Sequence, residues 1–544
     1  MTITTAKLSR AVRQAWTRPL ALSALLLAPV VHAVDLTGVE ATLDSAKSTL
    51  DGADLVKPSA NSWRIVPTLE LRQIFTDNIS LQPAERAHSQ FLTDISPGVT
   101  VNHRSRRLKV EGDTQLHFYA NAKEELGTRR SSSQLRGAAK AELVDDMVFV
   151  DASASMFQQS ISPFAQLVSN NEYASANRAN VKTWQVSPYL VNRFGRVARS
   201  ELRYLHDSVD AGSRSGLGNT EGDTVSYRLT SGPSWNDLTW GLSASQQQIN
   251  DEVLNDSNIK TASVNLGYQL LPTFAVTAAA FYDDYDYESV GGANGGRGHS
   301  AGIRWTPSRR TSIDASWGQR YYGPSRMLKA MHRSRRTIWN LSYDDSIVTT
   351  RANFLLPGAI DPLTGFPTPT APGLGNPGGA GTVNVVSNFG TPTRSNVNFF
   401  SNRFSLQKQL RASVALRGGR SSAVVNLYKV RREALSVREV DADLLGTPVD
   451  TLTDNIEQVG LNAVLTYRLS PRSDLNLSAE VADNESITTG FQARSSATRL
   501  LLNHRIGRNM FGVAELRRVT GATGLTSGAR YTENAVSVSL NMKL

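Results

Sequence analysis

Two short stretches of the sequence contain residue types that could do chemistry. The first, GHSAG at 298–302, matches the G-x-S-x-G pattern, which places a nucleophilic serine on a sharp turn between a strand and a helix. A glycine-rich stretch precedes Ser300 and an alternating segment follows it, so we interpret the match as accidental. Beyond the N-terminal leader the chain has seven histidines, none at a metal-ligand spacing. The sequence therefore predicts no catalytic constellation and no enzyme.

The second stretch, FYDDYDYE at 281–288, gathers four carboxylates. Clustered carboxylates could hold a hard cation such as calcium. The alternative is a solvated loop mouth, with Tyr282, Tyr285 and Tyr287 as interfacial aromatic side chains, and we favour it. The sequence therefore predicts neither a metal nor another cofactor.

Charged residues recur at positions of one parity inside alternating segments. An arginine or lysine facing lipid at mid-depth would cost about 2–4 kcal/mol, so such residues must face a polar lumen or lie at strand ends. Either they act on an anionic substrate, or arginine and glutamate pair only to satisfy each other. The excess of positive charge favours anions in a pore. The predicted lumen-lining residues are Arg72, Arg304, Arg320, Arg417, Arg468 and Glu480.

The segments around these charges alternate apolar and polar residues, as strands with one apolar face do. In WRIVPTLELRQIF the apolar parity holds Ile65, Leu69, Leu71 and Phe75, and the polar parity holds Glu70 and Arg72. The chain ends in another such strand, AVSVSLNMKL. A free strand edge invites aggregation, whereas a closed barrel pairs its last strand with its first. The barrel-closing strand is predicted to present Val536, Val538, Leu540, Met542 and Leu544 on one face.

Tight turns and longer polar stretches alternate along the chain. Turns at 194–196 and 470–473, for example, lie between longer stretches such as 160–179 and 435–455. This rhythm is typical of a bacterial outer-membrane barrel, with short periplasmic turns and longer external loops. Parity alone would also fit a two-sheet sandwich. Ten tight hairpins plus a first and a last strand predict an all-β fold: a transmembrane antiparallel outer-membrane β-barrel over 63–544 with roughly 22 strands (18–22).

The N-terminus sets the compartment. Residues 1–33 carry four basic residues and no acidic one, then an apolar run and a small-x-small site, which predicts a signal peptide cleaved after Ala33. An uncleaved anchor is the alternative. Residues 34–62 have helix-like spacing and are predicted to form a short helix or periplasmic tether. The protein should then lie in the outer membrane of a Gram-negative bacterium.

Composition excludes several classes of protein. There are no cysteines, so disulfides and cysteine metal sites are absent. Without the leader's four basic residues, 54 Lys and Arg face 48 Asp and Glu, a net charge of +6. The arginines are scattered rather than clustered, which does not favour nucleic-acid binding. The mean hydropathy is −0.28, and no apolar run after the leader reaches the roughly 20 residues of a membrane-spanning helix.

One segment interrupts the strand pattern. Residues 353–396 are rich in proline and glycine, and proline donates no ladder hydrogen bond, so this segment cannot be barrel wall. It is either a disordered external loop or a loop that folds in and constricts the lumen.

Four stretches have a distinctive pattern, namely WRIVPTLELRQIFTDNISLQP, FLTDISPGVTV, NRFSLQKQLRASVALRGGR and the terminal YTENAVSVSLNMKL. They resemble the PEP-CTERM system-associated outer-membrane proteins, and the resemblance extends over most of the chain after the leader. The terminal residue, Leu544, stands where many outer-membrane barrels have an aromatic residue. The motif residues are Thr76, Asp77, Asn78, Leu81, Asp94, Ser96, Pro97 and Gly98.

The resemblance implies a setting beside exopolysaccharide loci and exosortase protein sorting. The first hypothesis is a non-enzymatic, porin-like barrel that exports an exopolysaccharide, with outer-membrane lipids, the barrel assembly machinery and periplasmic export proteins as partners. The second is a non-conducting structural or assembly barrel of the same system. The third is an outer-membrane hydrolase, for which Ser300 is the one serine nominated.

Overall fold

A computed structural model describes residues 63–120, 130–166, 177–212, 219–252, 256–355, 403–436, 455–522 and 529–544. The predicted signal peptide (1–33) and tether (34–62) lie outside the described residues. So does most of the predicted proline- and glycine-rich loop, of which only 353–355 are described.

The described residues form 22 strands, a 3₁₀ turn η1 (Ala84–Arg86) and a five-residue helix α3 (Thr350–Phe354). The first eleven strands are β1 (Trp63–Thr76), β2 (Gln90–Arg104), β3 (Leu108–Ala120), β4 (Ser131–Val144), β5 (Val148–Ser160), β6 (Arg178–Phe194), β7 (Ala198–Asp210), β8 (Asn219–Ser231), β9 (Leu238–Asp251), β10 (Ser257–Leu271) and β11 (Phe274–Tyr285). The others are β12 (Gly295–Ser308), β13 (Thr311–Arg320), β14 (Gly323–Arg333), β15 (Thr337–Val348), β16 (Ser405–Arg417), β17 (Ser421–Ala434), β18 (Asn455–Ser470), β19 (Ser473–Ser486), β20 (Gln492–Arg505), β21 (Met510–Ala522) and β22 (Arg530–Lys543).

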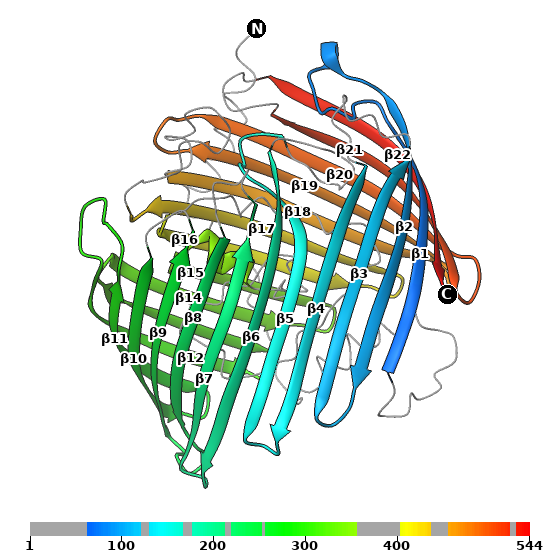
Figure 1. Ribbon diagram of the computed structural model, residues 1–544. Coiled ribbons are helices and arrows are strands. Elements are labelled where there is room, and N and C mark those ends of the chain that lie inside the picture. Colours follow the sequence, from blue (N-terminus) through cyan, green and yellow to red (C-terminus); the bar gives the residue numbers. More distant parts are fainter. Residues whose placement is uncertain are drawn as a thin grey trace. The chain divides into compact units, whose positions relative to one another are not determined.

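The strands form one closed antiparallel sheet. Each pairs with the next along the chain, and β22 returns to pair with β1, from Thr68 opposite Lys543 to Thr76 opposite Ala535. Figure 1 shows the first and last strands, in blue and red, side by side. The predicted antiparallel barrel is confirmed, and its 22 strands lie at the upper end of the predicted range.

The wall has an apolar outer face and a polar inner face. On β1 the side chains of Ile65 and Phe75 are exposed, while Ile74 and Thr76, of the other parity, are fully buried. Exposed aromatic residues of the outer face gather towards both strand ends, as in the aromatic girdles of membrane barrels. They include Trp63, Phe194, Trp305 and Trp339 at one end, and Phe75, Phe91, Trp184 and Tyr282 at the other. The barrel therefore has the outer surface of a membrane-spanning barrel.

The two ends of the barrel differ in their connections. At the turn end, ten connections are tight, such as 145–147, 272–273 and 471–472. At the loop end most connections are longer, apart from the two residues 321–322 between β13 and β14. Short turns are periplasmic in outer-membrane barrels, so the turn end is the periplasmic end. No helix among the described residues is long and apolar enough to cross a membrane.

Candidate functional site: inward connections at the loop end of the lumen

The connection between β1 and β2 folds inward at the loop end. Ile79 and Leu81 are 1% and 2% exposed and pack with Ile74, Val519 and Tyr531 of the inner wall. Leu81 adopts a positive φ of 50°, an uncommon conformation for leucine, which the surrounding packing holds. These apolar side chains therefore pack together on the inner side of the wall.

The connection between β5 and β6 crosses to a distant part of the wall. Phe164 is fully buried and packs with Ile456 of β18 and Ala493 of β20, which are not sheet neighbours of β5 or β6. The Asn484 Nδ2 of β19 donates a hydrogen bond of 3.0 Å to the Pro163 carbonyl. Gln166 Nε2 donates one of 3.1 Å to the Leu81 carbonyl, so this connection also holds the previous one.

A third connection, after β15, brings α3 against another part of the wall. The Thr349 hydroxyl caps α3 by accepting a hydrogen bond of 3.2 Å from the Ala352 backbone N–H. Phe354 is 2% exposed and packs with Val181 of β6 and Val209 of β7. These strands are not sheet neighbours of β15, so α3 joins two separate parts of the wall.

An ion pair fixes α3 in that position. Arg351 Nη2 donates to Asp207 Oδ2 of β7, and Arg351 Nε donates to Thr220 Oγ1 of β8 at 3.0 Å. The two charged side chains are 7% and 0% exposed. Burial lowers the pKa of the Arg351 guanidinium, and the facing Asp207 carboxylate acts against that shift. Gly222 makes room for the guanidinium, because a Cβ there would lie 3.0 Å from Arg351 Cζ.

Another apolar group closes the loop end beside β11. Tyr285 and Phe404 pack with Ile249 and Ile259, and Tyr287 stacks on Phe404 with ring centroids 4.9 Å apart. Burial raises the pKa values of Tyr287 and of the neighbouring Tyr321. Together with the three inward connections, this group places clusters of packed apolar side chains on the inner face at the loop end of the described residues.

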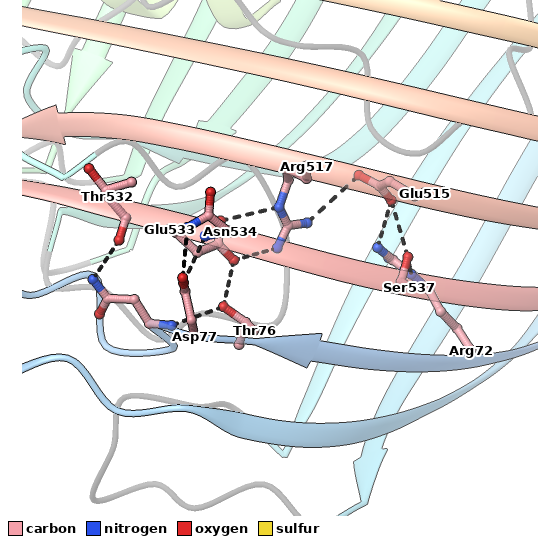
Figure 2. A network of polar contacts seen from close by, with 10 residues as sticks. Arg72, Thr76, Asp77, Glu515, Arg517, Thr532, Glu533, Asn534 and Ser537 are labelled. Carbon is pink, nitrogen blue, oxygen red and sulfur yellow. Dashed lines mark hydrogen bonds and ion pairs between the residues drawn. The ribbon is translucent and has the colours of Figure 1, made fainter.

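The motif residues Thr76, Asp77 and Asn78 lie where β1 meets β22, and Figure 2 shows the first two of them. Asn534 donates to the Asp77 carboxylate from both its backbone N–H and its Nδ2, each at 2.7 Å. Asn78 Nδ2 donates to the Thr532 carbonyl at 3.0 Å, and Thr76 Oγ1 donates to Glu533 Oε1 at 2.9 Å. We call these three motif residues with Thr532, Glu533 and Asn534 the seam latch. The latch ties the first strand to the last.

A charged network continues the seam latch along the inner face. Arg517 Nη2 lies 2.7 Å from Glu533 Oε1, and Arg72 Nη2 lies 3.0 Å from Glu515 Oε2 (Figure 2). Arg517 and Glu533 are at most 1% exposed. Breaking one of these pairs would leave a buried charge without its partner, which is costly, and the pairs join β1, β21 and β22.

The second motif segment lies on β2. The Ser96 hydroxyl donates to Asp94 Oδ1 at 2.6 Å, and His117 Nδ1 lies 2.7 Å from Ser96 Oγ and 3.0 Å from Asp94 Oδ2. A catalytic triad needs the serine on one ring nitrogen and the carboxylate on the other. Here both contacts use Nδ1, so this buried cluster does not have the geometry of a triad.

Gly98 of the same segment predicts a measurable stability change. A Cβ there would lie 2.7 Å from Thr68 Oγ1 and 2.8 Å from the Thr114 carbonyl oxygen, and the latter is backbone. We expect Gly98→Ala to lower the free energy of unfolding by about 1–3 kcal/mol, as overpacking does. Urea titration of the refolded barrel measures this change. Gly137→Ala is the control, because the nearest atom to its Cβ would be 4.0 Å away.

The six residues predicted to line the lumen all lie on inner-face positions. Arg320 is paired near the loop end, with its Nη1 3.3 Å from Asp283 Oδ2 and its Cζ 3.9 Å from the Phe281 ring centroid. Arg72 is paired with Glu515, as described above. Glu480 lies on β19 opposite Asn462. For Arg72 and Arg320 the structure therefore favours a pairing network over an open substrate path.

The other three predicted arginines lie towards the turn end. Arg304 Nε is 2.7 Å from Asp314 Oδ1, so it too is paired. Arg417 and Arg468 are exposed, and Arg468 faces Asp474 across the β18–β19 pair. Val536 and Val538 of β22 are exposed on the outer face, Leu540 and Met542 follow on the same parity, and Leu544 lies just beyond the strand.

The two stretches with possible chemistry lie in or beside the wall. Ser300 is in the extended strand β12, opposite Ala279 and Gly318, and not at a strand-to-helix turn. Asp283 is committed to Arg320. Among the described residues, no three His, Asp or Glu side chains converge as a metal site would require.

Sequence reasoning did not find the residues that close the loop end, above all Arg351 and Asp207. One signal was present in the sequence, namely apolar residues on the inner parity near the loop ends of strands. Ile74, Val181 and Val209 are such residues, and each is at most 2% exposed. Apolar residues on the inner parity near the loop ends of strands therefore indicate positions where side chains pack inside the lumen.

Comparison with known proteins does not assign the chain to a family. No family model matches it, and no curated protein matches it. Similar solved structures include the siderophore receptor PirA from Pseudomonas aeruginosa, with 10% identity over 89% of this chain and 81% of that one, and a TM-score of 0.42. Another is the FrpB iron transporter from Neisseria meningitidis, with 12% identity over 92% and 84% and a TM-score of 0.47.

A likeness of this degree says nothing about substrate, and the fold assignment rests on the strand pairings themselves. A closed sheet of 22 strands, an apolar outer face with aromatic girdles and a polar inner face define the class. The chain is a large β-barrel of the outer-membrane type.

Proposed function

We propose that the protein is an outer-membrane conduit in exopolysaccharide export and that it passes an anionic polymer. The observation that supports this most is the contrast between the two ends of the lumen. Buried apolar side chains pack inside the lumen at the loop end, while inner-face arginines at the turn end, such as Arg193, Arg417 and Arg468, are exposed. A conduit that opens on demand needs an accessible entrance and a closed exit.

The resemblance to PEP-CTERM system-associated outer-membrane proteins supplies the setting of this proposal. The leader would direct the chain to the periplasm, and the barrel assembly machinery would insert it into the outer membrane of a Gram-negative bacterium. Periplasmic export proteins would deliver the polymer to the turn end. The seam latch gives the family-motif residues Thr76, Asp77 and Asn78 a structural task in this barrel.

Deleting the gene from its host tests the proposal. We expect secreted acidic polysaccharide, measured as uronic acid in the medium, to fall at least ten-fold and the periplasmic pool to rise. Complementation with the intact gene should restore both. Unchanged secretion in the deletion strain would contradict the proposed function.

The second candidate is a non-conducting assembly barrel, and the closed loop end favours it. Phe164, Phe354 and Phe404 are each at most 9% exposed and sit in separate apolar clusters there. An assembly barrel would stay silent in a planar bilayer even when the contacts of α3 are broken. Conductance therefore separates the two candidates.

A further inference from the structure

The tight turns carry a strongly basic rim. The ten turns that separate the strand bounds at the turn end contain ten arginines against three aspartates, with no lysine or glutamate. Asp145 already pairs with Arg107 at 2.7 Å, so one of the three acidic residues is neutralised within the rim. The turn end is therefore the positively charged end of the barrel.

A second set of arginines lies just inside this rim. Each occupies an inner-face position at, or within three residues of, the end of a strand that enters a tight turn, and β2, β6, β14, β16, β18 and β20 each contribute one. We call this set the arginine ring. Its members are Arg104, Arg193, Arg333, Arg417, Arg468 and Arg505.

The arginine ring differs from the arginines at the closed end in its pairing. Arg72, Arg320 and Arg351 each face a carboxylate within ion-pair distance. Within the described part of the chain, no member of the arginine ring lies within ion-pair distance of Asp or Glu, although Arg468 faces Asp474 across the β18–β19 pair. Ion pairing within the fold therefore accounts for the paired arginines but not for the ring, in which Arg505 Nε donates a hydrogen bond of 3.3 Å to the Gly507 carbonyl of its own turn.

The direction in which the ring faces identifies its partner. Among the strand residues described within three positions of a tight turn, no outward-facing position holds arginine or lysine. Basic residues that recruit anionic lipid headgroups would face outward, towards the membrane. Those of the ring face the lumen, so their partner is a molecule that enters the barrel.

We propose that the arginine ring binds a carboxylate-bearing saccharide polymer at the periplasmic entrance of the barrel. This inference rests on the proposed export function and adds the place of capture. Arginine suits the task because its planar guanidinium pairs with carboxylates through two parallel hydrogen bonds. Spread over six strands, the ring engages successive sugar carboxylates around the entrance, and its field draws the chain in.

Binding of short polygalacturonate oligomers to the refolded barrel in neutral detergent tests the proposal. We expect binding that weakens as salt rises from 50 to 500 mM, and no binding of maltodextrin oligomers of equal length, which lack carboxylates. The test variant combines Arg333→Gln, Arg417→Gln and Arg468→Gln, and should weaken binding about ten-fold. Heat-modifiable gel mobility checks that the variant is folded.

The matched control removes the same charge from the other end. It combines Arg86→Gln, Arg518→Gln and Arg530→Gln, which are exposed residues at the loop end. Equal loss of binding in both variants, binding of maltodextrin, or no binding to the folded wild type would each overturn the proposal. A barrel that binds oligomers but fails the secretion test keeps the ring and loses the export function. If the deletion strain loses secretion but the barrel does not bind oligomers, the export function stands and the proposed role of the arginine ring is lost.

Discussion

Replacing Arg351 with alanine should turn a closed barrel into one that conducts ions. The change removes the charge that faces Asp207, which is fully buried, and removes the hydrogen bond to Thr220. Breaking a buried ion pair costs about 3–5 kcal/mol, because an uncompensated charge is left behind. Without this ion pair we expect α3 to leave its position, because a helix of five residues is unstable by itself. Single-channel recording in planar bilayers should show rare openings for the wild type and steady conductance for Arg351→Ala.

A second variant reaches the same result without removing charge. Gly222→Ala would place a Cβ 3.0 Å from Arg351 Cζ and 3.1 Å from its Nη1, so the guanidinium must leave its place beside Asp207. The control is Arg86→Ala, in the exposed turn η1. If neither Arg351→Ala nor Gly222→Ala conducts more than this control, α3 does not close the lumen, and the assembly role becomes the better interpretation.

Replacing Glu533 with alanine should cause the largest loss of stability in the wall. Glu533 is fully buried, accepts hydrogen bonds from Arg517 at 2.7 and 3.2 Å, and accepts another from Thr76 at 2.9 Å. Its removal deprives the buried Arg517 guanidinium of that carboxylate. We expect the free energy of unfolding to fall by about 3–5 kcal/mol.

Urea titration of the refolded barrel, followed by heat-modifiable gel mobility, measures this loss. The control is Glu85→Ala, because Glu85 lies exposed in η1 and should change stability by less than about 0.5 kcal/mol. A Glu533→Ala barrel as stable as the control would mean that the charged network is not what holds the seam.

The wall could be predicted from sequence because its pattern is local. Alternation over a few residues places Ile65 outside and Arg72 inside, and turn residues mark the hairpins. The closed loop end could not be predicted in this way. Arg351 and Asp207 are 144 positions apart, and no local pattern pairs them. Arg351 lies two residues before the proline- and glycine-rich segment 353–396, and no pattern in the sequence around it predicts a partner.

The motif residues show a different limit. The resemblance singles out Thr76, Asp77 and Asn78, but nothing local says what they contact. Their partners, Thr532 to Asn534, lie more than 450 positions later, on the strand that happens to close the sheet. The pairing of the first strand with the last brings them together, and this long-range pairing cannot be predicted from the local pattern of a single sequence.

The seam latch has a geometric consequence for the whole barrel. Every neighbouring pair of strands except one is joined directly through the chain, and ten of these pairs are joined by tight turns that fix their register. The pair β1–β22 has no such connection, so contacts between the two strands, the seam latch among them, must hold its register. In a closed sheet that last register sets the shear, and with it the tilt of the strands and the radius of the barrel. A slip of two residues at Asp77 and Asn534 would therefore change the bore along its entire length.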